Sequence, residues 1–282
     1  MDCDLSDGEI FLDSMKGGGM SEKSIIIKKE ESLATLILNR PQQMNAINEE
    51  MYDELLNAFE EIGKDNEVKA LILTGAGRAF CSGYDFNTRF FRGLRATNFV
   101  QKEVRNGVME AGRPILALRS LAKPVIAAVN GYAIAGGFSL ALASDVIVAS
   151  EKARFAEGHI NFASHPDCGT TYFLPRLLGT ARAFEFILTG KTIEAKEAER
   201  IGLVNKVVAP ENLDMVAKEL AHAISKAPVG LLRLVKASIY LGSAMELDSA
   251  MENEATAQSI CALMEECRET SKIYFEKFKG KQ

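Results

Sequence analysis

The chain of 282 residues has no tryptophan and few of the side chains that bind zinc. Its histidines are His159, His165 and His222, and its cysteines are Cys3, Cys81, Cys168, Cys261 and Cys267. No two cysteines have the Cys-x-x-Cys spacing of zinc sites and redox motifs. We therefore expect no metal site. An odd number of scattered cysteines in a chain of this length indicates reduced thiols and a cytoplasmic protein.

Long hydrophobic runs are missing as well. No apolar run reaches the roughly 20 residues that a bilayer-spanning helix requires. The acidic N-terminus lacks the basic and apolar segments of a secretory signal. Lys and Arg total 33 against 38 Asp and Glu, which gives a formal net charge of −5. This balance argues against binding to nucleic acid or to a membrane surface through bulk charge, so we expect neither partner.

Most of the negative charge lies in the first twenty residues. The acidic side chains there are Asp2, Asp4, Asp7, Glu9 and Asp13, and the one basic side chain is Lys16. Three glycines follow at 17–19, a pattern typical of a flexible linker. We predict a disordered acidic tail over residues 1–23, which leaves the rest of the chain close to neutral.

Short strands with continuous apolar sequence begin after this tail. Residues 25–27 and 33–38 predict two strands joined by a charged turn, and further apolar runs occupy 70–74, 125–129 and 145–149. Runs that are apolar on both faces are typical of strands buried between layers of helices. They indicate an α/β fold.

Helical patterns separate these strands. Asn48 precedes an amphipathic stretch with Met51, Leu55 and Phe59 at helical spacing, and residues 137–143 predict an unusually apolar helix. From residue 211 onward, helical patterns dominate. We predict a strand-rich core over 24–210 and a helical C-terminal region over 211–282.

Two glycine-rich junctions follow apolar strands. One is Ala135-Gly136-Gly137 at the start of the apolar helix, and the other lies in RAFCSGYD at 78–85. The first N–H groups of a helix are unpaired and lie at the positive end of its dipole. Two such junctions can supply the two N–H donors of an oxyanion hole. The alternative is that glycine serves close packing alone.

Several segments in order along the chain resemble the crotonase superfamily, also called the enoyl-CoA hydratase/isomerase family. The resemblance covers about residues 24–282. Its motifs are LNRP at 38–41, NAI at 45–47, AFCSGYD at 79–85, KPVIAAVNGYAIAGGFSLALASD at 123–145, LPR at 174–176 with Gly179, LTG at 188–190 and AERIGLVNKVV at 198–208.

This resemblance implies a crotonase-like spiral of ββα turns, with residues 211–282 used in trimer packing. It implies an acyl-CoA thioester as substrate, with coenzyme A as part of the substrate and no separate cofactor. It also implies a homotrimer or a hexamer of the chain.

The resemblance also assigns residues. The backbone N–H groups of Tyr84 and Gly136 correspond to the family's oxyanion hole. Coenzyme A would lie near Ser82, Tyr84, Asp85 and Phe86, with Tyr274 and Lys277 of the last helix reaching the site of a neighbouring subunit. The alternative for Lys277 and the lysines around it is a solvated basic end.

Two family positions differ here. The family's hydratases use two glutamates as acid and base on a water molecule, and the corresponding residues in this chain are Ser139 and His159. A neutral serine cannot hold water as a carboxylate base does. We therefore do not expect ordinary hydration of an enoyl-CoA.

Asp167, eight residues after His159, is another candidate acid or base. It corresponds to a working aspartate in dienoyl-CoA isomerases, dihydroxynaphthoyl-CoA synthases and 4-chlorobenzoyl-CoA dehalogenases, although the dehalogenases' upstream histidine is absent here. In a pocket its pKa would be raised. The alternative is a helix N-cap, since Asp167 follows Pro166 just before a predicted helix that starts near Cys168.

The remaining candidates each have two interpretations. His159 is a proton shuttle near neutral pH or a core histidine in the space of the missing glutamate. Ser139 is a packing residue or the partner of His159 in thioester hydrolysis. Glu157 is two residues from the family's glutamate position and would need a local shift. The other candidates are Phe86, Phe90 and Phe91, as acyl-pocket lining or ordinary core, and His165, as a surface residue.

Together these features predict an enzyme that acts on an acyl-CoA thioester and stabilises an enolate or oxyanion. We expect an isomerase, hydrolase or lyase for an unusual unsaturated acyl-CoA. The alternatives are a hydratase with atypical acid and base residues, and a non-catalytic acyl-CoA-binding protein of the same fold.

Overall fold

The main sheet has six strands in the order β1-β2-β3-β5-β7-β10 in the computed structural model, which describes residues 23–88, 91 and 101–277. Only β1 and β2 pair antiparallel, and the other neighbours are parallel. The strands are β1 (Ile25–Glu30), β2 (Leu33–Leu38), β3 (Ala70–Gly75), β5 (Val125–Val129), β7 (Val146–Ser150) and β10 (Lys206–Val208). The predicted tail, up to residue 22, and Phe90 lie outside the described residues.

A second sheet has the order β4-β6-β8-β9. Its strands are β4 (Ala79–Cys81), β6 (Tyr132–Ile134), β8 (Arg154–Ala156) and β9 (Ile193–Glu194). The successive pairs β3–β4, β5–β6 and β7–β8 each give their first strand to the main sheet and their second to this smaller one. The predicted α/β spiral is confirmed.

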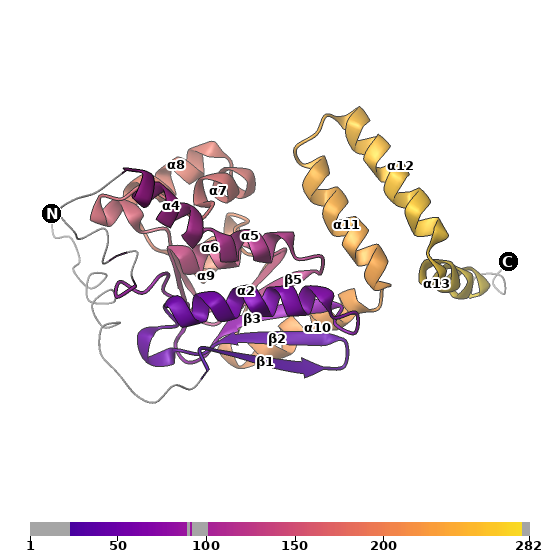
Figure 1. Cartoon of the computed structure of the whole chain (residues 1–282), viewed down its shortest axis with the longest axis horizontal. Coiled ribbons are helices and arrows are strands. Elements are labelled where there is room, and N and C mark those ends of the chain that lie inside the picture. Colours follow the sequence, from indigo (N-terminus) through magenta and orange to yellow (C-terminus); the bar gives the residue numbers. More distant parts are fainter. Residues whose placement is uncertain (1–22, 89–90, 92–100, 278–282) are drawn as a thin grey trace.

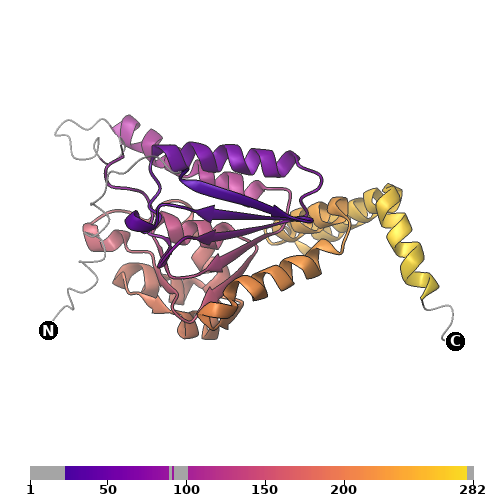
Figure 2. The same cartoon turned by 90° about the horizontal axis from the view of Figure 1, so that it is seen from below.

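Helices cover both faces of the main sheet. Figure 2 shows the sheet between α2 (Glu49–Lys64) and α10 (Leu213–Ser225). Helix α2 begins where predicted, because the side chain of Asn48 accepts a hydrogen bond of 2.9 Å from the N–H of Met51. On the other face, α10 buries Leu213, Ala217 and Ala221 against strand residues such as Ile72.

The first strand is longer than predicted. β1 continues through Lys28, Lys29 and Glu30, and the turn is confined to Glu31 and Ser32. β1 is an edge strand whose residues after Ile25 are exposed, so charged side chains reach water from either face. The charged residues at 28–30 therefore belong to an exposed edge strand and not to the turn.

The apolar helix α6 (Gly136–Ala143) begins one residue before the predicted start, and all eight of its residues are buried. The other helices of the core are η2 (Pro41–Gln43), α4 (Gln101–Ala111), α5 (Arg113–Ser120), η3 (His159–Phe162), α7 (Thr170–Leu178), α8 (Thr180–Thr189), α9 (Ala195–Arg200) and η4 (Pro210–Asn212). Within the described part of the chain, no helix combines the length and apolar composition of a membrane span.

The C-terminal region is mostly helical, as predicted, and its last helix ends at Glu276. α11 (Val229–Gly242), α12 (Leu247–Leu263) and α13 (Glu265–Glu276) extend away from the sheets (Figure 1). Because α10 packs on the main sheet, the helices that lie apart from the core begin with α11. The Lys236 ammonium lies 2.8 Å from Asp145 Oδ2, and the Tyr240 hydroxyl donates to Oδ1 of the same carboxylate. These contacts anchor α11 to the core.

Candidate active site

The two glycine-rich junctions meet in the structure. A Cβ atom added to Gly83 would lie 3.4 Å from the backbone N of Gly136, and one added to Gly136 would lie 2.9 Å from Cδ2 of Tyr84. A Cβ atom on Gly137 would lie 2.1 Å from the carbonyl oxygen of Cys81. Only glycines allow the start of α6 to approach the segment after β4 this closely.

The amide N–H of Tyr84 points away from Ile47, with which Tyr84 forms an isolated parallel β-bridge. The N–H of Ile47 donates to the carbonyl of Gly83 at 2.8 Å, and the N–H of Asp85 donates to the carbonyl of Ile47 at 2.9 Å. The carbonyl of Gly83 and the N–H of Asp85, on either side of Tyr84, thus both face Ile47. Because amides alternate in direction along extended backbone, the N–H of Tyr84 faces the opposite side.

The start of α6 carries backbone strain. Ala135, its N-cap, has φ 48° and ψ −119°, a conformation that L-residues rarely adopt. The N–H of Ala135 donates to the carbonyl of Ala156 at 2.9 Å, which holds this conformation in place. Gly136 follows as the first residue of the helix, where a backbone N–H has no partner within the helix. The amides of Tyr84 and Gly136 therefore stay the predicted donors to an oxygen atom.

The phenol of Tyr84 is fixed by the end of α4. Its hydroxyl donates to the carbonyl of Ala111, to which the Cys168 thiol also donates at 3.7 Å. Burial raises the pKa of Tyr84 well above its ordinary value, and burial likewise raises the pKa of Cys168. Both side chains stay protonated at neutral pH and hold the loop before α7 near Tyr84.

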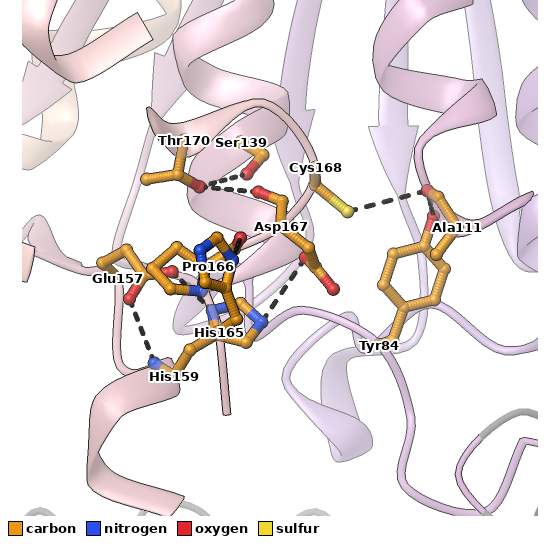
Figure 3. A network of polar contacts seen from close by, with 10 residues as sticks. All are labelled: Tyr84, Ala111, Ser139, Glu157, His159, His165, Pro166, Asp167, Cys168 and Thr170. Carbon is orange, nitrogen blue, oxygen red and sulfur yellow. Dashed lines mark hydrogen bonds and ion pairs between the residues drawn. The ribbon is translucent and has the colours of Figure 1, made fainter. Parts of the chain in front are cut away.

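Three titratable side chains lie in a row beside this site. We call them the Glu157–His159–Asp167 cluster (Figure 3). Oε2 of Glu157 accepts the backbone N–H of His159 at 3.1 Å, and Oε1 lies 2.5 Å from Nδ1 of the same imidazole. On the other side of the ring, Nε2 lies 3.4 Å from Oδ1 of Asp167. Glu157 is fully buried, and the Asp167 side chain is 21% exposed.

The two carboxylates determine the charge of the imidazole. Burial alone would lower the pKa of His159, but the hydrogen bonds and negative charges of Asp167 and Glu157 outweigh it and raise that pKa to about 9. Burial alone would raise the pKa of Asp167, but the hydrogen bond and positive charge of His159 outweigh it and lower that pKa. At neutral pH, His159 is an imidazolium ion and Asp167 is a carboxylate.

This result corrects two expectations. A raised pKa was expected for Asp167 in a pocket, whereas its pKa is lowered. His159 was considered as a shuttle that titrates near neutral pH, whereas it is protonated there and cannot act as a base. The imidazole is buried and contacts a carboxylate at each nitrogen, so it also does more than fill space.

The N-cap interpretation of Asp167 is wrong. Helix α7 starts at Thr170 and its N-cap is Gly169, with no side-chain capping bond. The backbone carbonyl of Asp167 accepts both the N–H and the hydroxyl of Thr170, at 3.1 and 2.9 Å. These bonds fix the backbone, and the carboxylate interacts with His159 and Cys168.

Ser139 is not the partner of His159. Its hydroxyl lies 3.1 Å from that of Thr170, and the residue is fully buried on α6. Of the two interpretations of Ser139, the pairing with His159 is therefore wrong, and the residue is buried on α6. His165 is exposed, as expected, and its Nδ1 lies 2.6 Å from the Pro166 carbonyl.

The residues expected near coenzyme A on the first loop lie together. The Asp85 carboxylate accepts from Arg40 at 3.1 Å and from the Asn87 N–H at 2.9 Å. Its side chain therefore fixes the loop. Ser82 is half-buried, and its hydroxyl lies 3.5 Å from the carbonyl of Gln43.

An aromatic row extends from His159 to this loop. The ring centre of Phe162 lies 5.4 Å from that of His159 and 6.3 Å from that of Phe86, which in turn lies 4.9 Å from Phe91. Phe86 is therefore connected to the cluster through Phe162, and Phe86 and Phe91 are half-buried and not part of the main core. The lining of an acyl pocket by these rings stays a prediction.

Tyr274 and Lys277 lie far from this site within one chain. Both are exposed at the end of α13, which Figure 1 shows beyond α11 and α12. If they contact coenzyme A, they do so at the site of another copy of the chain, as the sequence led us to expect.

Glu157 has a larger role in the cluster than the sequence predicts. β8 ends at Ala156, and Gly158 with φ 75° turns the chain so that the backbone and ring of His159 both face Glu157. The signal was the sequence Glu-Gly-His directly after an apolar strand, in which glycine allows the reversal. The role of Thr170 as the partner of Ser139 carried no comparable signal.

The comparisons with known proteins agree with this fold. The profile of the family described as Enoyl-CoA hydratase/isomerase matches residues 28–281. The short-chain-enoyl-CoA hydratase of Clostridium acetobutylicum is 37% identical over 92% of this chain and 97% of that protein. The 1,2-epoxyphenylacetyl-CoA isomerase of Escherichia coli is 33% identical over 90% of this chain and 95% of that protein.

A solved structure of a relative has a similar fold. The enoyl-CoA hydratase of Bacillus anthracis superposes with a TM-score of 0.83 at 32% identity, covering 90% of this chain and 96% of that one. The family profile spans nearly all of the described chain, and the relatives match over almost their full lengths. The chain belongs to the enoyl-CoA hydratase/isomerase family of enzymes.

Proposed function

We propose that this protein is an acyl-CoA isomerase that moves a double bond by proton transfer, with Asp167 as the acid and base. The observation that carries the proposal is the Asp167 carboxylate, held ionised by His159 and directed towards Tyr84 (Figure 3). A single carboxylate beside an oxyanion hole is what a 1,3-proton transfer needs.

The reaction follows from these groups. The thioester carbonyl of a 3-enoyl-CoA accepts hydrogen bonds from the N–H groups of Tyr84 and Gly136. Asp167 takes a proton from C2, and the electrons of that bond pass into a dienolate whose oxygen the two N–H groups stabilise. Asp167 then returns the proton to C4, which leaves a double bond between C2 and C3.

Hydration is less well supported by the side chains present. Ser139 is buried and bonded to Thr170, and His159 is an imidazolium at neutral pH. Neither can activate a water molecule as a base. Among the relatives, one named for isomerisation of an acyl-CoA is 33% identical to this chain.

We further propose that the C-terminal helices pack against other copies of the chain in a trimer or hexamer. α12 has no buried residue, and α11 and α13 have one each, Lys236 and Cys267. The exposed large apolar side chains of these helices are Val235, Ile239, Leu241, Leu247, Met251, Ile260, Leu263, Ile273, Tyr274 and Phe275. A second copy would remove this surface from water.

A direct assay tests the reaction. Purified protein is incubated with 3-hexenoyl-CoA, and the conjugated 2-enoyl product is followed by ultraviolet absorbance and chromatography. We expect isomerisation in the wild type, loss of about 10²–10⁴-fold in kcat for Asp167→Asn, and retained binding. Asp214→Asn, an exposed aspartate on α10, is the matched control and should be unaffected. Hydration of crotonyl-CoA faster than isomerisation would contradict the proposal.

A further inference from the structure

Glu157 has no place in the proton transfer proposed above, yet it is the most buried member of the cluster. It is fully buried at the turn after β8, and both of its oxygens face His159, one at the backbone N–H and one at the imidazole. A carboxylate in this position costs considerable free energy unless a cation compensates it. The cation available is the imidazolium of His159.

We propose that Glu157 is a positioning residue, which keeps His159 protonated so that its Nε2–H holds the Asp167 carboxylate in the geometry for proton transfer. This inference rests on the proposed function, since it assumes that Asp167 is the acid and base.

The distances determine which nitrogen keeps its proton. Nδ1 lies 2.5 Å from Glu157, whereas Nε2 lies 3.4 Å from Asp167. When the imidazolium loses one proton, the shorter bond to Glu157 retains the Nδ1–H. Nε2 then turns its lone pair towards Oδ1 of Asp167, and an attractive contact becomes a repulsive one. The hydrogen bond from Nε2–H to the Asp167 carboxylate therefore exists only while His159 carries both protons.

The groups that face His159 come from three segments. Glu157 precedes η3, Asp167 precedes α7, and Phe162 at the end of η3 contributes its ring at 5.4 Å. Asp167 is also influenced by His165 and Cys168. Of these groups, the two carboxylates favour the imidazolium and burial opposes it.

The test is Glu157→Gln, which keeps the shape of the side chain and removes its charge. We expect the pKa of His159 to fall from about 9 towards its ordinary value of 6.5. The alkaline limb of the kcat/KM profile should then move to lower pH by about two units. At pH 8, kcat/KM should fall at least tenfold, whereas at pH 6 it should stay within threefold of the wild type.

Nuclear magnetic resonance of the imidazole nitrogens gives a readout that needs no turnover. The chain has only three histidines, and His159→Gln assigns the relevant signals. Glu194→Gln, an exposed glutamate of β9, is the matched control and should change neither readout. Glu157→Asp keeps the charge at a greater distance, should give an intermediate pKa, and carries the test if Glu157→Gln does not fold.

The outcomes are separable. An unchanged pKa of His159 in the Glu157 variants, or an equal loss of kcat/KM at pH 6 and pH 8, would overturn the inference. Full isomerase activity in Asp167→Asn would overturn the proposed function, even where the nuclear magnetic resonance titration shows that Glu157 controls the charge of His159.

Discussion

The ring of Tyr84 lies against Gly136, so closely that a methyl group added at Gly136 would lie 2.9 Å from Cδ2 and 3.0 Å from Cε2. The ring has little room to move, because its hydroxyl is bonded to the carbonyl of Ala111. The contact therefore fixes the spacing between the two segments whose amides face the proposed thioester oxygen.

The substitution Gly136→Ala should abolish most turnover without unfolding the protein. The new methyl group would push the Tyr84 segment away from α6 and separate the two N–H donors. Loss of one oxyanion donor typically lowers kcat by about 10²–10³-fold. Gly242→Ala is the control, since its added methyl group would meet only Ala250 at 3.9 Å. Activity of Gly136→Ala within threefold of the wild type would contradict this role.

Stability should depend on pH through His159. Its pKa in the folded protein, about 9, is above its ordinary value of 6.5. The stabilisation from its ion pairs is therefore complete below pH 6.5 and is lost as the pH rises through 9. We expect the free energy of unfolding to fall by about 1–3 kcal/mol over this interval. Urea denaturation of the wild type and His159→Gln checks this.

In His159→Gln the decline between pH 6.5 and pH 9 should be smaller, because the group that titrates has been removed. Parallel curves for the two proteins would show that His159 does not carry the effect. Asp167 acts in the opposite direction. Its pKa is lowered, so its contribution is present above its ordinary pKa and is lost as the pH falls through the folded value.

The contribution of the α11 anchor to stability should be measurable when the hydroxyl oxygen of Tyr240 is removed. In Tyr240→Phe the Asp145 carboxylate loses a hydroxyl donor but keeps Lys236 at 2.8 Å. We expect a loss of about 1–3 kcal/mol in the free energy of unfolding, because the lost bond is to a charged group. Tyr172→Phe, on a half-exposed ring that stacks below Arg176, should change it by less than about 0.5 kcal/mol.

Self-association should weaken when charge is placed on the C-terminal helices. Leu263 is 78% exposed in one chain. Leu263→Lys would bury an unpaired ammonium group in a subunit interface and should raise the dissociation constant at least tenfold by sedimentation velocity. Leu116→Lys, at a leucine 62% exposed on α5, is the comparison. A wild-type protein that sediments as a monomer would overturn the predicted trimer or hexamer.

The elements were predictable where local chemistry determines them. Asn48 caps α2, and the apolar runs at 70–74 and 125–129 became strands because each is buried on both faces. The charged residues at 28–30 predicted a turn, but they belong to β1. Charged side chains on an exposed edge strand give the same sequence pattern as those of a turn. The sequence predicts α10 as part of the C-terminal helical region, because an apolar helix face has the same pattern whether it packs on a sheet or on a helix. In the structure this face packs on the main sheet.

The site was predictable in part. The glycine junctions predicted which backbone segments approach one another, because few residue types other than glycine permit such close contact between two backbones. The side-chain pairings were not predictable. Ser139 bonds to Thr170 and His159 to Glu157 through the particular turns at Gly158 and Gly169, and sequence spacing alone does not fix the direction of those turns.

The most direct test of the account is proton exchange at the substrate. A 3-enoyl-CoA is incubated with the enzyme in D2O, and deuterium at C2 and C4 is followed by nuclear magnetic resonance and mass spectrometry. We predict that the wild type forms the 2-enoyl product and catalyses exchange at these carbons, and that Asp167→Asn does neither while still binding the thioester. Exchange by Asp167→Asn at the wild-type rate would contradict the assignment of Asp167 as the group that moves the proton.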